Sequence, residues 1–282
     1  MLEALKTRVG HWTHAGAKTG CTAILFDADA VASAEVRGGA PASRELDLLS
    51  PQKTVTNIDG IVLTGGSAFG LAAADGAMRY LHERDRGVAT PGGKVPIVPT
   101  LALFDLANGD ERVVPNADAG YAACVAALTA PEMGSVGAGT GATTGAVTGT
   151  PTPAGIAMET ATRGALQVTA IVAVNAFGVI DAHGDAAQRL AGTPNLPGFG
   201  EDVFVSHTTI GAVITNAELD KTACRLVAQG AHHGLARAVA PSHTRFDGDA
   251  FITASTGTVP ANVDVVALLA TVAVADAICS FA

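Results

Sequence analysis

The sequence TTIGAVIT, residues 208–215, decides the fold that we predict for this chain. It is a short apolar run rich in β-branched residues, which is typical of a buried strand. The segment before it, residues 194–206, contains proline and glycine breakers and is predicted to be a loop. A long helix is predicted after the strand, at 221–239, and a second buried strand at 168–175. A loop, a buried strand and a helix therefore follow one another directly.

The rest of the chain alternates short strand-like runs with Ala-rich helical runs. Further strands are predicted at residues 21–26 and 60–63, and further helices at 68–83, 119–128 and 261–281. This order lacks the regular βαβ alternation of a doubly wound fold. Because no linker divides the chain, we predict one layered α+β domain over residues 1–282, with helices covering a β core.

Charged residues are scarce in this sequence. Its 282 residues include 17 Lys and Arg and 26 Asp and Glu, so the net charge is −9 and only 15% of residues are charged. Disorder requires low hydrophobicity and high charge, which is the reverse of this composition. So few basic residues also argue against a nucleic-acid partner. The low charge indicates either membrane insertion or burial of much of the surface.

The apolar runs are too short for a membrane protein. A spanning helix needs about 20 continuous apolar residues, and the best run, 265–275, has about half that number. It is also bracketed by Asp264 and Asp276. The charged N-terminus has no apolar signal region, and the four cysteines form no CxxC pair. We therefore predict a cytoplasmic protein with reduced thiols and no membrane partner.

A glycine turn, Gly65-Gly66-Ser67, precedes the helix predicted at 68–83. Ser67 is a candidate nucleophile, but Phe69 breaks the G-x-S-x-G pattern, so a role as the helix N-cap is favoured. The helix N-terminus, with Gly66 and Ser67, is a weaker candidate for binding a substrate carboxylate.

Two other loops concentrate ionisable residues. Residues 37–47 contain four charged residues and predict surface ion pairs, a subunit contact or a substrate-binding loop. Asp247-Gly248-Asp249 fits a turn best, with a cation site or a pair of carboxylates as alternatives. His232 and His233 are adjacent on a helix and point apart, so they predict no shared metal site. We expect neither a metal nor a cofactor.

Six segments occur in an order that indicates a known family. They are VRGGAPASRELDLLSP (36–51), LTGGSAFGLAAADG (63–76), VPIVPTLALFDL (95–106), VAVNAFG (172–178), TTIGAVITNAEL (208–219) and GLARAVAPSHTRFDGDAFITASTG (234–257). The pattern resembles the family of L-aminopeptidase D-amidase/D-esterase, the β-peptidyl aminopeptidases and the endo-type nylon-oligomer hydrolase. The resemblance covers nearly the whole chain. It implies a four-layer αββα sandwich and a self-processing hydrolase with an N-terminal nucleophile.

The resemblance also implies roles for particular residues. The chain would cut itself between His207 and Thr208, giving pieces 1–207 and 208–282, and Thr208 would become the nucleophile. Its freed α-amine, with a pKa near ~8, is a suitable base. Asn175 would donate to the oxyanion, and Asp247 with Asp249 would orient the amine. The substrate would be a small amide or peptide.

Two positions depart from the family pattern, which leaves alternatives open. His207 stands where relatives usually have Asn or Gly, and Thr148 stands in a stretch where they often have Lys. Thr148 is therefore a weak candidate for substrate binding. An uncleaved, inactive scaffold protein and an acyltransferase are the alternatives to an amidohydrolase. The resemblance further implies a homo-oligomer, which would cover apolar helix faces.

Overall fold

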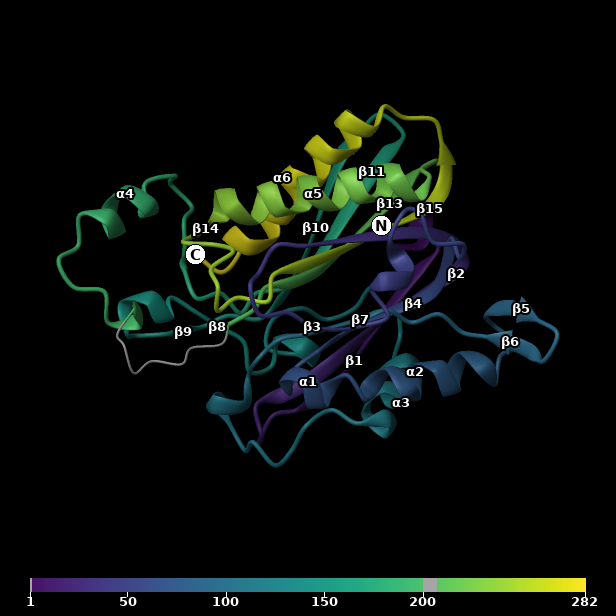
Figure 1. Cartoon of the computed structure of the whole chain (residues 1–282), viewed down its shortest axis with the longest axis horizontal. Coiled ribbons are helices and arrows are strands. Elements are labelled where there is room, and N and C mark those ends of the chain that lie inside the picture. Colours follow the sequence, from purple (N-terminus) through teal and green to yellow (C-terminus); the bar gives the residue numbers. More distant parts are fainter. Residues whose placement is uncertain (1, 200–206) are drawn as a thin grey trace.

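The computed structural model describes residues 2–199 and 207–282, and its main feature is a large sheet (Figure 1). Within these residues, nine strands form this sheet, in the order β10-β11-β13-β15-β2-β4-β7-β3, with β1 paired to β2. The strands are β1 (Thr7–His14), β2 (Thr19–Val36), β3 (Ala42–Arg44), β4 (Asn57–Thr64), β7 (Thr100–Ala102), β10 (Ile156–Arg163), β11 (Leu166–Ala173), β13 (Ile210–Ala217) and β15 (Ala250–Val259).

Helices cover the two outer faces of the sheet. The long helices are α2 (Ala73–His82), α3 (Ala117–Val125), α5 (Lys221–Ala238) and α6 (Val263–Cys279), and the short ones are α1 (Ser67–Gly70) and α4 (Ala186–Ala191). Three pairs of short strands lie outside the main sheet: β5 (Val88–Thr90) with β6 (Gly93–Val95), β8 (Thr143–Thr144) with β9 (Thr152–Pro153), and β12 (Val179–Ile180) with β14 (Val239–Ala240). Short 3₁₀ helices occur at Leu2–Leu5, Asp47–Leu49, Leu106–Asn108, Gly137–Gly139, Ala146–Thr148 and Pro197–Phe199. Among the described residues, no helix is both long enough and apolar enough to cross a bilayer.

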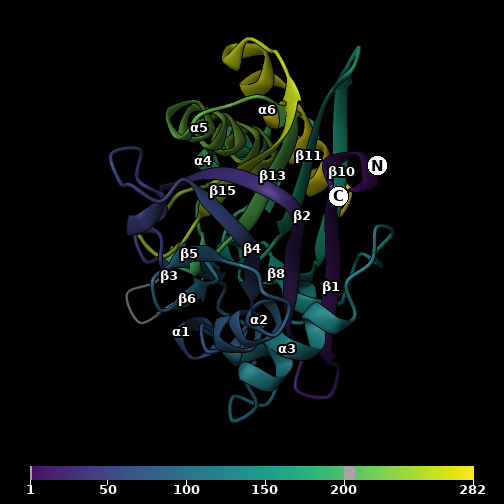
Figure 2. The same cartoon turned by 90° about the vertical axis from the view of Figure 1, so that its right-hand side faces the viewer.

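Strand β2 belongs to both strand layers, so the nine-stranded sheet folds over on itself into two stacked layers. Its first part pairs with β1 and β4, whereas its last residues pair with β15, from Val31↔Ser255 to Val36↔Ala250. A register shift between Leu25 and Ala30 lies where β2 passes from one layer to the other. Figure 2 shows α5 and α6 on one side of the strands and α2 and α3 on the opposite side. The layers are therefore helix, strand, strand and helix.

Three apolar cores match these four layers. Along β2, Ile24 and Phe26 lie in the middle core between the strand layers, whereas Leu25 packs in the core beneath α2 and α3. This alternation follows the two-residue period of a strand. Along β11, Ile171 faces the middle core and Val172 faces the core beneath α5 and α6. The structure confirms the predicted layered α+β class, with the strands of both layers joined in one sheet.

Small residues allow α5 and α6 to pack closely. A Cβ added at Gly230 of α5 would lie 2.6 Å from the carbonyl oxygen of Ala267 in α6. The hydroxyl of Thr271 in α6 donates to the carbonyl of Gly230 at 2.8 Å. The Ala- and Gly-rich composition therefore serves close contact between helices.

The predicted helix at 68–83 requires a correction. It is divided into α1 and α2, because hydrogen bonds from Leu71 to Ala68 and from Ala72 to Phe69 tighten the backbone between them. Ser67 is also not the N-cap. Gly66 occupies that position with φ of 77°, and Ser67 begins α1 with φ of 52°. The Asp105 carboxylate, which the sequence does not place here, accepts the Gly66 N–H at 2.7 Å.

Candidate active site

The ends of three neighbouring strands bring four predicted site residues to one edge of the sheet. Strands β11 and β13 are antiparallel, with Ala173 opposite Ile210, so Asn175 after β11 lies beside Thr208 before β13. Strands β13 and β15 are parallel, with Ile210 opposite Ala250. The residues that precede these two strands therefore also meet, and a β-bridge joins His207 to Asp247.

Thr208 is buried and lies in a compact group of polar atoms. Its hydroxyl donates to the carbonyl oxygen of His207 at 2.6 Å, and its backbone N–H donates to the carbonyl of Asn175 at 2.6 Å. The backbone nitrogen of Gly248 is 3.1 Å from Thr208 Oγ1 and 3.1 Å from the His207 carbonyl oxygen. A hydroxyl, a peptide carbonyl and an amide donor are thus grouped around the bond between His207 and Thr208.

The two acids of the Asp247-Gly248-Asp249 turn are buried and hold the surrounding backbone. Asp247 accepts from the N–H and hydroxyl of Thr244, and at 3.4 Å from the N–H of Phe177. Asp249 accepts from the N–H of Thr209 at 2.9 Å. In the intact chain the carboxylates therefore position the neighbours of Thr208.

The environment of this turn disfavours charge on Asp247. Burial, and secondarily the nearby charge of Asp249, raise the pKa of Asp247 from 3.8 to about 7, against the lowering effect of its hydrogen bonds. Burial also lowers the pKa of His207 to about 4, so this ring is neutral at physiological pH. The turn therefore readily holds a proton near neutral pH, and His207 adds no positive charge to it.

Asn175 is fully buried, and its side-chain amide is fixed by two neighbours. Its Nδ2 donates to the carbonyl of Phe104 at 2.9 Å, and its Oδ1 accepts from the N–H of Thr143 at 3.0 Å. An Asn amide has two N–H groups. These two contacts engage one of those N–H groups and the amide oxygen, and they fix the orientation of the side chain.

The weaker candidates lie in neighbouring turns. The Gly66 N–H donates to the Asp105 carboxylate. The residue before Asp105 is Phe104, whose carbonyl accepts from the Asn175 side chain, so the turn at Gly66 supports Asn175 indirectly. Thr148 is exposed, and its hydroxyl bonds within its own turn, to the Gly145 carbonyl at 2.8 Å and to Thr150 at 3.1 Å. The predicted loop at 194–206 lies largely outside the described residues.

The loop after β2 forms surface ion pairs, as its sequence predicts, with Arg44 bound to Asp75 at 2.6 Å and Asp47 to Lys53 at 2.9 Å. It also reaches the acid turn, residues 247–249. The N–H groups of Arg37 and Gly38 donate to the Asp249 carbonyl at 3.0 and 3.2 Å, and that of Ala40 donates to the Asp247 carbonyl at 2.8 Å. A Cβ at Gly38 would lie 2.3 Å from the Asp249 nitrogen. Glycine is required because the two backbones touch. The Arg-Gly-Gly-Ala sequence was the available signal for this support.

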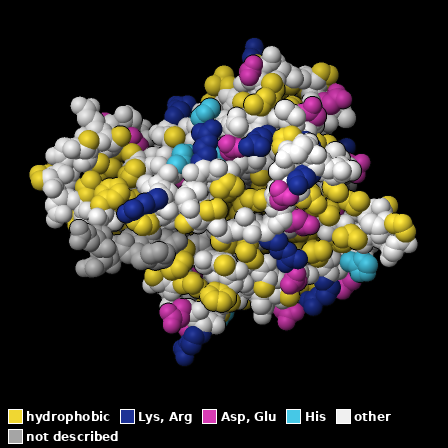
Figure 3. Space-filling view, viewed as in Figure 1, with side chains coloured by type: hydrophobic (Ala, Val, Ile, Leu, Met, Phe, Trp, Pro, Cys, Tyr) yellow, Lys and Arg dark blue, Asp and Glu magenta, His cyan; other side chains and the backbone are white. Residues whose placement is uncertain are grey.

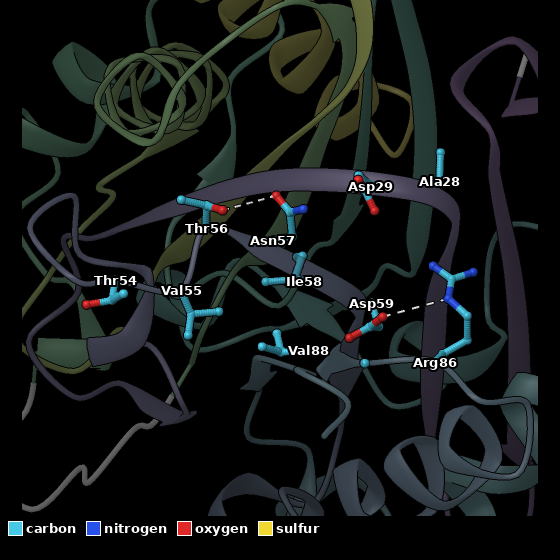
Figure 4. Close-up of a pocket in the computed structure, with 11 residues that line it drawn as sticks. Ala28, Asp29, Thr54, Val55, Thr56, Asn57, Ile58, Asp59, Arg86 and Val88 are labelled. Carbon is cyan, nitrogen blue, oxygen red and sulfur yellow. Dashed lines mark hydrogen bonds and ion pairs between the residues drawn. The ribbon is translucent and has the colours of Figure 1, made fainter. Parts of the chain in front are cut away.

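A separate cavity of about 340 Å³ lies where β2 bends over β4 and β5. Figure 4 shows Asp59 directed toward Arg86 at its rim, and the two charges are 3.8 Å apart. None of its lining residues belongs to the group around Thr208. On the face shown in Figure 3, basic side chains are interspersed with acidic ones and form no single basic patch.

The fold of this chain is also found in enzymes of known structure. Solved structures with the same architecture include the L-aminopeptidase D-Ala-esterase/amidase of Ochrobactrum anthropi, described as a variant of the N-terminal-nucleophile (Ntn) hydrolase fold. The two structures superpose with a TM-score of 0.72 at 18% identity, over 97% of this chain and 82% of that one. The two chains therefore share one fold, which in that enzyme is described as a variant of the Ntn hydrolase fold.

The family follows from the sequence match. The model of peptidase family S58 matches residues 6–280, and the chain belongs to that family. An uncharacterized aminopeptidase of Mycobacterium leprae is 40% identical over 269 residues, which cover 88% of this chain and 73% of the relative. A 6-aminohexanoate-oligomer endohydrolase of Agromyces sp. is 26% identical over 255 residues, 84% of this chain and 69% of the relative. As a member of this peptidase family, the protein is a hydrolase of peptide or amide bonds.

Proposed function

We propose that this protein cuts its own chain between His207 and Thr208 and then hydrolyses small amides or peptides with Thr208 as its N-terminal nucleophile. One observation supports this most directly: the Thr208 hydroxyl, the His207 carbonyl and the Gly248 N–H lie within hydrogen-bond distance of one another. The family match supports the class of reaction.

Self-cleavage would begin with attack of Thr208 Oγ1 on the carbonyl carbon of His207. Negative charge would develop on the carbonyl oxygen, which already accepts the Gly248 N–H at 3.1 Å. The carbon–nitrogen bond would break, and the proton lost from the hydroxyl would end on the Thr208 nitrogen. Water would then hydrolyse the ester, releasing a carboxylate on His207 and a free hydroxyl and amine on Thr208. The His207 side chain has no part in these steps.

In the mature enzyme the new α-amine of Thr208 would act as the base. An amine with a pKa near ~8 is partly neutral at physiological pH and takes the hydroxyl proton. The nitrogen that becomes this amine already donates to the Asn175 carbonyl at 2.6 Å, which keeps it beside the site. Thr208 Oγ1 would attack the substrate carbonyl, and the side-chain amide of Asn175 would stabilise the oxyanion. Water would release the acyl group.

Intact-mass measurement with denaturing electrophoresis tests this proposal. We expect the purified protein to contain pieces 1–207 and 208–282 in place of the 28.1 kDa chain. Thr208→Ala should remain intact and should not hydrolyse a panel of aminoacyl and β-aminoacyl anilides. Thr208→Ser keeps a hydroxyl and should still be processed, which makes it the matched control.

The same experiment separates the alternatives. A Thr208→Ala chain that is still cut at this bond contradicts the proposal. Intact wild-type chains without amidase activity would favour an inactive scaffold protein. Transfer of the acyl group to an added amine, detected by mass spectrometry, would identify an acyltransferase.

A further inference from the structure

His243, in the segment between α5 and β15, is fixed to Asp249 through both its backbone and its ring. Asp249 Oδ2 accepts from the His243 backbone nitrogen at 3.0 Å and from His243 Nδ1 at 2.9 Å. The side chains of His243 and Asp249 are 17% and 3% exposed. His243 has φ of 55°, in the left-handed region that few residues other than glycine adopt. The surrounding contacts therefore hold His243 in this conformation.

The ring beside His243 is that of His232, from α5, and it is neutral. The two ring centroids are 4.8 Å apart with an angle of 68° between the planes. His232 Nε2 lies 2.9 Å from the Glu35 carbonyl, which only accepts hydrogen bonds, so Nε2 bears the hydrogen. Burial lowers the pKa of His232 to about 4. His232 therefore brings no positive charge to Asp249 at neutral pH.

The other charged groups around this pair engage different partners. Glu35, on β2, pairs with Arg37 at 4.0 Å and with Arg225 of α5 at 3.2 Å. Arg245 lies over the ring of Phe246, with 4.6 Å from its guanidinium carbon to the ring centroid. On the side of Asp247, the neutral ring of His207 packs on Phe177. Within the described residues, His243 is thus the ionisable side chain that forms a hydrogen bond with a carboxylate of the acid turn, residues 247–249.

The hydrogen bonds of the two acids are unequal. Asp249 accepts from three N–H groups, one of them on the ionisable ring of His243. Asp247 accepts from Thr244 and, at the longer distance of 3.4 Å, from Phe177, and these donors are neutral. When two buried carboxyls lie close together, the better-solvated one keeps the charge and the other keeps a proton.

We propose that His243 is a positioning residue that keeps the negative charge of the acid pair on Asp249 and the proton on Asp247. The charged Asp249 then holds the Thr209 N–H and with it the backbone that follows Thr208. This inference rests on the proposed function, since it assigns His243 a part in preparing that nucleophile.

The charge distribution can be measured without activity. Carbon-13 NMR of labelled aspartates in the intact Thr208→Ala chain follows each carboxyl through a pH titration. We expect the Asp247 carboxyl to keep its proton to a higher pH than a free aspartate does, with its pKa raised to about 7. His243→Ala should let Asp247 share the negative charge of the pair, so that part of the Asp247 signal changes at a lower pH than in the parent chain. His243→Asn retains a neutral donor and tolerates positive φ, so it should give a smaller shift in the same direction.

Kinetics supply the second measurement. In the wild-type background, we expect His243→Ala to move the acid limb of the pH–rate profile for processing or hydrolysis to higher pH, with His243→Asn in between. An Asp247 titration curve that is the same in the parent chain and in both His243 variants would overturn the role of His243. If Thr208→Ala were still processed, the proposed function would fail, whereas the NMR titration would still decide where the charge lies.

Discussion

At the scale of single residues, the arrangement at the 207–208 bond depends on one glycine amide. The Gly248 nitrogen lies 3.1 Å from both the attacking oxygen and the carbonyl oxygen of the proposed self-cleavage. Within the described part of the chain, the one side chain that donates a hydrogen bond to that carbonyl is the Thr208 hydroxyl, which is the attacking group itself. The backbone of the acid turn is therefore as important to the proposed chemistry as its two carboxylates.

Gly248→Ala should slow self-cleavage. A Cβ at this position would lie 2.8 Å from Thr208 Oγ1 and 2.8 Å from the Ala40 carbonyl oxygen, so the hydroxyl or the turn must shift. Loss of an oxyanion donor typically costs about 10²–10³-fold in rate, and we expect at least roughly tenfold here. Processing can be timed by electrophoresis after refolding. Gly16→Ala, whose added Cβ would meet its nearest atom at 3.8 Å, should process at the wild-type rate.

Asp247 should make the stability of the intact chain depend on pH. Its pKa is raised from 3.8 to about 7, so the folded state favours the protonated carboxyl. The associated stability is complete below the unfolded pKa and is lost as pH rises to about 7. In the Thr208→Ala background, Asp247→Asn should remove this slope, because an amide does not titrate in this interval.

Urea unfolding at several pH values checks this prediction. The measured quantity is the difference in the free energy of unfolding between the Thr208→Ala chain and the Thr208→Ala, Asp247→Asn chain. The comparison between the two chains is needed because other groups also make the stability depend on pH. The buried rings of His207 and His232, with pKa values of about 4, stabilise the fold as pH rises, which is the opposite of the effect of Asp247. Their stability is complete above the unfolded pKa of 6.5 and is lost as pH falls toward 4. Equal slopes with and without the Asp247 carboxyl would contradict the raised pKa.

At the scale of elements, sequence patterns located the strands and helices better than the loops between them. The predicted strands at 168–175 and 208–215 correspond to β11 and β13. Both strands are buried on both faces, and their β-branched residues pack in one core on each face. Loops gave weaker signals, since their partners are distant in sequence. The glycines after Arg37 indicate that another backbone comes close, but they do not identify Asp249 as the partner. Likewise, the turn at Gly66 does not identify Asp105.

The first turn of α5 offers a test of such a distant contact. Lys221 is buried, and its ammonium donates to the carbonyls of Leu48, Lys53 and Val55 at 2.9, 3.1 and 2.8 Å. Lys221→Met leaves three acceptors without a donor and should lower the free energy of unfolding by about 2–4 kcal/mol. Lys53→Met removes an exposed pair with Asp47 and should cost less than about 0.5 kcal/mol. Similar losses in thermal or urea unfolding of both variants would refute a supporting role for Lys221.

At the scale of the whole molecule, the four layers depend on β2, and its dual pairing could not be read from the sequence. The family resemblance supplied the sandwich, whereas composition and periodicity supplied only the α+β class. The same resemblance indicated Thr208, Asn175 and the two acids, and the strand order explains why they meet. His243 was missed because its connection to Asp249 depends on a left-handed backbone that no local pattern predicts.

The strand order also predicts that the two pieces of the processed chain stay together. Residues 208–282 contain β13 and β15, which lie between β11 and β2 of the larger piece, and their inner faces complete the middle core. Separation would break hydrogen bonds along both edges and expose that core, so we expect one complex and one cooperative unfolding transition. Native mass spectrometry should detect both pieces in a single species, while denaturing electrophoresis should separate them. Free 208–282 piece in native buffer would contradict this arrangement.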